Sequence, residues 1–277
     1  MNKTDQMSFF GFEAEPNAAK PSVTSKPVKS QVPSAPASAA LAAAGTEPQR
    51  PVAAPTEVAA SVDAPLLVQP QAAQATDPEA MAQTLAQHPD FRVLRRLVPH
   101  SDYGPVNGQA TQRVIVLDTE TTGLDSKNES IIELAMLSVL VDTATGLPVG
   151  PVTVYESFED PGKPIPSQIT EITGIDDSMV QGQRIDDAAV NALVQEADLI
   201  VAHNAGFDRP FVESRLPAFA KVAWACSFAD IDWKAQGRSS AKLESLAQAL
   251  GLFYDAHRAE MDCHALLAVL DQQEARS

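Results

Sequence analysis

The feature that most constrains this fold is a change of composition near residue 78 of the 277-residue chain. Residues 14 to 77 consist mainly of Ala, Pro, Val, Gln, Ser and Thr, with few aromatic side chains. A segment of this kind cannot bury enough apolar surface to offset the conformational entropy that it would lose on ordering. We therefore expect residues 1–77 to form a disordered Ala/Pro-rich tail, and the folded structure to follow it.

Beyond residue 78 the apolar residues recur with the spacing of regular secondary structure. Two short helices are expected within 78–98, as part of an N-terminal extension (78–111) that packs on a domain spanning 112–277. Three strands followed by alternating helices and strands indicate an α/β domain with a mixed, five-stranded sheet flanked by helices. The expected strands are 113–118, 132–141, 153–158, 199–202 and 222–226, and the expected helices are 208–216, 242–250 and 260–272.

Charge and composition exclude several classes of function. The formal charge of −16 argues against a protein that grips long duplex nucleic acid without regard to sequence, because such proteins carry a basic surface. The apolar runs are too short to span a membrane, and the N-terminus has no apolar signal region. Two cysteines cannot form a disulfide framework in a chain of this length, so we expect a cytoplasmic protein.

Two carboxylates close the first strand, in the sequence VIVLDTETTGL. Asp118 and Glu120 are two positions apart, and alternate residues of a strand face the same side. Neighbouring carboxylates repel each other, and a bound cation removes that conflict. Ligands that are all oxygen favour Mg²⁺ or Mn²⁺. The pair alone is also typical of a solvated turn, so its meaning depends on the rest of the chain.

Two further acids follow in patterns that are unremarkable when each is taken alone. Asp208 lies in HNAGFD, in the first turn of a helix that Asn204 can cap, and Asp262 lies five residues after His257 in HRAEMD. Either acid could simply complement a helix dipole. An acid pair, an acid after HNAGF and a histidine five residues before an acid, in this order, make a structural explanation for all of them improbable.

With these motifs the chain resembles the DEDDh 3′→5′ exonucleases, the family of the proofreading (epsilon) subunit of bacterial DNA polymerase III, over roughly residues 112–272. The resemblance implies a ribonuclease H-like fold and two divalent ions, Mg²⁺ or Mn²⁺. It implies that Asp118 bridges both ions, that Glu120 and Asp262 complete one site and that Asp208 supports the other. His257 would be the general base, since an imidazole titrates near neutral pH.

The same resemblance suggests which residues contact the substrate. Backbone and side chains after the acid pair would hold the terminal nucleotide, and Phe207 would pack near the last bases. The family commonly has histidine where this chain has Thr173, which puts the substrate preference in doubt. The candidate substrate-binding residues are Thr121, Thr122, Gly123, Thr173, Asn204 and Phe207.

The N-terminal tip carries a second, independent pattern. Gln6, Phe9 and Phe10 lie in QMSFF, ahead of the expected tail, where aromatic residues are unusual. The string resembles the short glutamine-plus-hydrophobic motif by which bacterial replication and repair proteins bind the sliding clamp. We expect residues 6–10 to be a candidate clamp-binding segment, tethered to the domain through the tail. An unremarkable tail remains the alternative.

The sequence thus predicts an enzyme that removes nucleoside 5′-monophosphates from DNA 3′ ends, single-stranded or frayed, in replication proofreading or DNA repair. A DNA polymerase and the sliding clamp are its candidate partners, and no membrane partner is expected. The alternatives are an RNA 3′→5′ exonuclease of the oligoribonuclease or RNase T type, and a non-catalytic docking module. The five intact positions Asp118, Glu120, Asp208, His257 and Asp262 argue against the docking module.

Overall fold

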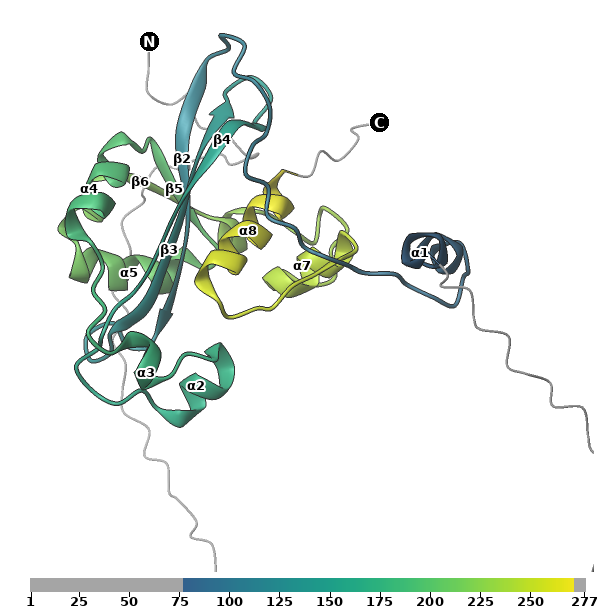
Figure 1. The fold of residues 1–277 in the computed structure, drawn as a ribbon. Helices are drawn as coiled ribbons and strands as arrows, with labels where there is room; N and C mark the ends of the chain where they lie inside the picture. Colours follow the sequence, from purple (N-terminus) through teal and green to yellow (C-terminus); the bar gives the residue numbers. More distant parts are fainter. Residues whose placement is uncertain (1–76, 272–277) are drawn as a thin grey trace, which may run out of the picture. The chain divides into compact units, whose positions relative to one another are not determined.

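A computed structural model describes residues 77–271 of the chain (Figure 1). The expected tail and the tip at Gln6, Phe9 and Phe10 lie outside the described residues. The main sheet has five strands in the order β4-β3-β2-β5-β6. Its first three strands are antiparallel neighbours, and β5 and β6 run parallel to β2. The strands are β2 (Thr111–Thr121), β3 (Ile131–Asp142), β4 (Pro148–Phe158), β5 (Leu199–Ala202) and β6 (Ala223–Cys226).

This arrangement confirms the predicted ribonuclease H-like α/β fold with a mixed five-stranded sheet. Each expected strand is present, and β2 is longer than expected. It continues to Thr121, so Asp118 and Glu120 lie within the strand. In the antiparallel register, Glu120 lies opposite Glu133 of β3, and β2 and β3 bury most of their residues on both faces.

Helices cover both faces of the sheet (Figure 1). Val114 and Val116 of β2 face α7 (Leu243–Ala249) and α8 (Ala259–Leu270), whose apolar side chains complete one core. Ile115 and Leu117 point to the opposite core, which α4 (Asp187–Glu196), α5 (Ala205–Arg215) and η1 (Pro217–Lys221) cover. The short helices α2 (Ser167–Thr173) and α3 (Asp177–Val180) bury a third, smaller cluster against Ile132, and α6 (Ser227–Asp230) follows β6.

The N-terminal extension differs from the sequence prediction. One of the two expected helices forms, as α1 (Pro78–Ala86), and none of its residues is buried by the described part of the chain. The second expected helix is wrong: β1 (Arg95–Arg96) pairs in parallel with β7 (Leu252–Phe253). This extended path buries Leu97 in the core beside α7 and α8. The local apolar spacing does not reveal this packing, because its partners are distant in the sequence. The boundaries of the three predicted regions stay a prediction.

No helix within residues 77–271 combines the length and the apolar character that crossing a membrane requires.

Candidate active site

Three acids from two distant parts of the chain meet at the end of β2. Asp118 and Glu120 project from the face of β2 that packs against α8, and Asp262 lies in the first turn of that helix. One carboxylate oxygen from each acid lies within 4.8 Å of the other two. A single divalent ion can bind such a set of oxygens, so these three residues form the centre of the candidate site.

Asp208 reaches the same end of β2 from the opposite face of the sheet. It lies in the first turn of α5 and is 2% exposed. Its Oδ1 accepts hydrogen bonds from the backbone N–H of Thr119 (3.1 Å) and from the Thr119 hydroxyl (2.8 Å). Thr119 lies between Asp118 and Glu120, so these bonds join the fourth acid directly to the strand that carries the first two.

The turn into α5 is made by Asn204, though not in the way that the sequence predicted. Asn204 occupies the N-cap position in a left-handed conformation (φ 77°), which asparagine adopts more readily than most residues. Its side chain makes no capping hydrogen bond within the described residues. His203, just before it, links the end of β5 to α6 through Ser227 Oγ (2.8 Å) and to the carbonyl of Ala241 (2.8 Å).

The four acids share an electrostatic conflict. Burial and the neighbouring carboxylates, Asp208 first among them, hold the pKa of Asp118 well above its ordinary value. Burial, then Asp262, Glu133 and Asp208, raise the pKa of Glu120 to about 8. Burial raises the pKa of Asp208 to about 7 and also raises that of Asp262. A bound cation would remove this repulsion, so the four acids are candidate ligands for cations.

His257 lies at the edge of this cluster with its side chain exposed. Its backbone is left-handed (φ 63°), and its N–H donates to Asp262 Oδ2 at 2.8 Å. The other oxygen, Oδ1, accepts a hydrogen bond from the Tyr254 hydroxyl at 2.9 Å. The loop before α8 thus holds both oxygens of Asp262, and this contact brings the predicted base and the predicted ligand to the same place.

Sequence reasoning missed two charged residues beside the cluster, Glu133 and Arg258. The Glu133 carboxylate is fully buried, and it pairs with the Arg258 guanidinium at 2.8 Å. A signal for Glu133 was available, because it is an acid within the apolar run IIELAMLSVLV, and a buried acid requires a partner. Its partner could not be read from local sequence.

The expected substrate contacts divide into two groups. Thr121, Thr122 and Gly123 follow the acid pair in a compact turn, where the Thr121 hydroxyl donates to Gly123 O (2.6 Å) and the Thr122 hydroxyl donates to Glu129 (2.5 Å). A Cβ added to Gly123 would lie 3.0 Å from the Glu129 side chain, so a larger residue there would require that side chain to shift.

Phe207 and Thr173 form the second group. Phe207 is half-buried, and its ring packs against that of Phe211 at 5.2 Å between centroids. Thr173 is buried, and its hydroxyl donates to Ile169 O (3.0 Å) and accepts from Ile175 N–H (3.0 Å). The hydroxyl therefore closes α2, while the neighbouring Ile172 is 54% exposed. The sequence resemblance did not single out Ile172.

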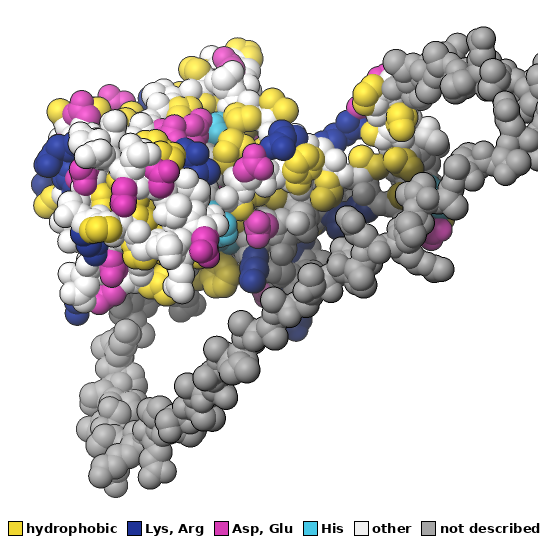
Figure 2. All heavy atoms as spheres, turned by 60° about the horizontal axis from the view of Figure 1, so that its bottom comes forward, with side chains coloured by type: hydrophobic (Ala, Val, Ile, Leu, Met, Phe, Trp, Pro, Cys, Tyr) yellow, Lys and Arg dark blue, Asp and Glu magenta, His cyan; other side chains and the backbone are white. Residues whose placement is uncertain are grey.

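Basic side chains stand singly among acidic and apolar ones on the face of the domain that Figure 2 shows. Many of the described arginines are already paired within the chain. The pairs include Arg95 with Glu79, Arg209 with Glu213, Arg215 with Glu159 and Arg258 with Glu133. The −16 charge of the sequence is therefore not offset by a continuous basic surface on this face.

Comparison with known proteins places this geometry in a family. The exonuclease family model (RNase T type) matches residues 115–270. The chain is 36% identical over 107 residues to a PolC-type DNA polymerase III of Caldanaerobacter subterraneus subsp. tengcongensis, a match that covers 36% of this chain and 7% of the relative. It is 29% identical over 177 residues to the PolC-type enzyme of Thermotoga maritima, covering 61% of this chain and 12% of the relative.

Among solved structures, one of exonuclease X in complex with 5′-overhanging duplex DNA has a TM-score of 0.42 and 25% identity, covering 57% of this chain and 89% of that one. The chain spans only about a tenth of the length of the two PolC-type relatives. The family model, by contrast, runs from the second residue of the apolar core of β2 to the end of α8, and so covers more than half of the chain, including all the acids described above. The protein belongs to the exonuclease family.

Proposed function

We propose that this exonuclease removes nucleotides one at a time from DNA 3′ ends, in the 3′→5′ direction, and requires divalent metal ions. The observation that carries the proposal is the convergence of Asp118, Glu120 and Asp262 within 4.8 Å, joined by buried Asp208. Four acids with raised pKa values, to which no arginine or lysine of residues 77–271 is bonded, form a donor set that fits Mg²⁺ or Mn²⁺.

The resemblance to the DEDDh exonucleases suggests the role of each residue in this donor set. Asp118, the most central acid, would bind both ions, Glu120 and Asp262 would complete one site, and Asp208 would support the other. When bound, the two ions offset the negative charge that develops on the attacking and leaving oxygens. His257 takes a proton from the attacking water on an imidazole nitrogen. The water oxygen then bonds to phosphorus, and the bond from phosphorus to the 3′ oxygen of the preceding nucleotide breaks. That oxygen takes up a proton from solvent, and a nucleoside 5′-monophosphate leaves.

DNA is the proposed substrate because the relatives with substantial identity are named as DNA polymerases. An association with a DNA polymerase, and a role in proofreading or repair, rest on the same support. The candidate substrate-binding residues Thr121, Thr122, Gly123, Asn204 and Phe207 stay part of this proposal. For Thr173 the proposal is weaker, because its hydroxyl is already used within α2.

The direct test uses the purified full chain, Mg²⁺ or Mn²⁺, and single-stranded DNA labelled at either end. We expect a 3′ label to leave at once as a mononucleotide, and a 5′-labelled strand to shorten in single steps. A chelator should stop both reactions. Immediate release of the 5′ label would contradict the polarity. Faster cleavage of an RNA strand of matched sequence would favour the RNA exonuclease alternative, and no cleavage of either would contradict the function.

The tip at Gln6, Phe9 and Phe10 is proposed as a clamp-binding segment on its sequence alone. Burial of two phenylalanines can contribute several kcal/mol before losses of entropy, so a free peptide is expected to bind with micromolar affinity at best. Titration of a peptide covering residues 1–16 against the sliding clamp of the same organism tests the proposal. A matched peptide with Phe9→Ala and Phe10→Ala is the control. Equal binding by both peptides, or none by either, would contradict it.

A further inference from the structure

The chain enters α8 through three consecutive residues that are each held by a different contact. The His257 N–H donates to Asp262 Oδ2 at 2.8 Å. Arg258 extends its guanidinium to Glu133, and the Ala259 N–H donates to Glu133 Oε2 at 2.9 Å. The first N–H groups of a helix have no partner within the helix, so Glu133 of β3 caps the start of α8. This path fixes the backbone on both sides of the histidine.

Glu133 is placed beside the acidic cluster but is not free to join it. It lies opposite Glu120 across the β2–β3 ladder, and its side chain has no exposed surface. Its Oε1 accepts from Arg258 Nε at 3.1 Å and from Arg258 Nη2 at 2.8 Å. Arg258 Nε also lies 3.4 Å from Oε2, so two N–H groups of one guanidinium fix the position of this carboxylate. The Glu133 carboxylate therefore holds the loop that carries His257 in place.

Arg258 is held in turn by β4. Its Nη2 lies 3.3 Å from Glu156 Oε1, and its guanidinium lies over the Phe158 ring, 5.6 Å from the centroid. The guanidinium is thus bound to two strands of the sheet at once. Because three groups determine its position, a shift of the His257 loop would require several favourable contacts to break together.

The loop needs such support, because His257 adopts a backbone conformation that is unfavourable for its residue type. Its φ of 63° lies in the left-handed region, which residues other than glycine keep only where surrounding contacts hold them in it. The His257 side chain is exposed, so packing around the ring does not fix its position. The backbone contacts must do so instead.

We propose that Glu133 and Arg258 form a positioning pair that fixes His257 for proton abstraction. The inference rests on the proposed function of His257 as general base, and it adds two residues to which the family resemblance assigned no role. Neither residue needs to touch the substrate or an ion. The pair acts on the reaction only through the place of the imidazole, and a misplacement of about 1 Å in an active site can reduce the rate about 100-fold.

A direct phosphate contact by Arg258 is the competing explanation, and kinetics separates the two. A residue that only positions His257 affects kcat and leaves KM nearly unchanged, whereas a residue that binds the substrate raises KM. Glu133→Gln is the cleaner variant, since it keeps the size of the side chain and leaves the Arg258 side chain itself present. Arg258→Gln is its partner variant.

We expect Glu133→Gln and Arg258→Gln each to lower kcat about 10- to 100-fold, in the range seen for supporting residues around active sites, with KM within about twofold. In a His257→Ala background, neither substitution should lower kcat further. Glu159→Gln and Arg215→Gln, which alter another arginine–glutamate pair, should leave kcat unchanged. A large further loss in the His257→Ala background, or a rise in KM without a fall in kcat, would overturn the proposal.

Hydrogen exchange tests the same pair without catalysis. In the full chain, Glu133→Gln should speed amide exchange at Ala259 and in residues 255–260, whereas Glu159→Gln should not. If wild type proves inactive on every nucleic acid, the proposed function fails, while the exchange result still decides whether the pair holds the loop. Unchanged exchange in both Glu133→Gln and Arg258→Gln would overturn the positioning role even in an active enzyme. Thermal melting of each variant confirms that it is folded.

Discussion

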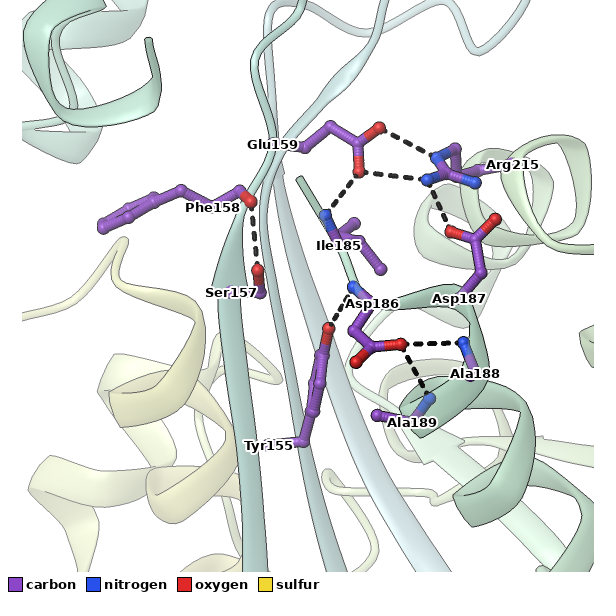
Figure 3. Close-up of polar contacts among 10 residues, drawn as sticks. All are labelled: Tyr155, Ser157, Phe158, Glu159, Ile185, Asp186, Asp187, Ala188, Ala189 and Arg215. Atoms are coloured by element: carbon purple, nitrogen blue, oxygen red, sulfur yellow. Dashed lines mark hydrogen bonds and ion pairs between the residues drawn. The ribbon is translucent and has the colours of Figure 1, made fainter. Parts of the chain in front are cut away.

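Two groups of carboxylates in this domain differ in whether a positively charged side chain of the same protein balances their charge. At the end of β2, Asp118 and Glu120 face Asp262. Burial raises the pKa values of all three acids, and repulsion from neighbouring carboxylates raises those of Asp118 and Glu120 further. Beside α4 and α5, Glu159 and Asp187 face the Arg215 guanidinium (Figure 3). The residue types are the same, but the two groups differ in burial and in the presence of an arginine.

The Arg215 group is complete without a ligand. Arg215 Nε lies 2.9 Å from Glu159 Oε1, and its Nη2 lies 2.7 Å from Asp187 Oδ1. Glu159 Oε2 also accepts the N–H of Ile185 at 3.0 Å (Figure 3). The hydrogen bond from Arg215 lowers the pKa of Asp187, so this carboxylate is ionised at neutral pH at no cost. These contacts tie the end of β4 to the start of α4 and the end of α5.

The difference shows how to tell a structural acid from a functional one in this fold. A carboxylate whose partner is an arginine of the same chain needs nothing further. A group of carboxylates that raise one another's pKa values is unfavourable in the isolated chain and is kept for what it binds. Glu133 lies beside the acids at the end of β2. Its partner, Arg258, nevertheless makes it an arginine-paired carboxylate, like those of the Arg215 group.

The largest expected difference between the two groups is in turnover after one acid of each is replaced by alanine. Asp118→Ala should lower turnover by about three orders of magnitude or more, because the acid proposed to bind both ions is lost. Asp187→Ala removes an acid that is half exposed and paired, so turnover should stay within about twofold. Steady-state rates on single-stranded DNA at saturating Mg²⁺ measure both. Near wild-type turnover of Asp118→Ala would remove the basis for the comparison.

Most of the fold and the acidic group follow from local sequence. The five strands are visible in the sequence as apolar runs, and the acids lie at fixed spacings within short motifs. The strands and the acids were therefore both predicted. The roles of the acids and of His257 stay predictions, because no ion or substrate accompanies the chain. The motifs predicted which acids meet only through the family that they resemble.

Contacts between distant residues account for what was not predicted. Phe91, Leu94 and Val98 have helical spacing, yet the segment is extended because Arg95–Arg96 pairs with Leu252–Phe253, more than 150 residues away. Glu133 and Arg258 are 125 residues apart, so neither could be assigned a partner from its neighbours. Thr173 was expected at the substrate, but its hydroxyl closes its own helix, a contact that competes with any outward role.

The next largest effect is on the pH dependence of stability without metal. The pKa of Glu120 is raised to about 8 and that of Asp208 to about 7, so between their ordinary values and pH 8 the folded state holds protons that the unfolded state has released. Stability must therefore fall as pH rises through this range. We expect the Tm in chelator to drop by several degrees from pH 5 to pH 8, since 1 kcal/mol corresponds to about 2–4 °C in a domain of this size.

Divalent ions should reverse that drop, and most strongly at pH 8, where they replace the protons. Thermal melts from pH 5 to pH 8.5, in chelator and in excess Mn²⁺, give both curves. A metal-free Tm that is flat or rises across this range would show that the acids do not repel one another as described.

The smallest effect is a difference of sign between two isosteric substitutions in metal-free protein at pH 8. Asp118→Asn removes one negative charge from a group of carboxylates that repel one another, so it should raise the Tm or leave it unchanged. Glu159→Gln removes one charge from a group that is balanced, and it weakens two bonds to Arg215. Glu159 and Arg215 are 14% and 22% exposed, so the loss should be about 1–3 kcal/mol, between the values for exposed and for buried pairs.

Both substitutions replace a carboxylate by an amide of nearly the same shape, so packing changes little and the sign reports charge balance alone. Melting curves in chelator measure the pair side by side, and excess Mn²⁺ supplies the control. With the ion bound, Asp118→Asn should become the destabilised variant relative to wild type, because it has lost a ligand, while Glu159→Gln should keep the same deficit as before. If Asp118→Asn melts well below wild type without metal, the acids at the end of β2 are held by contacts within the chain, and the distinction between the two groups is lost.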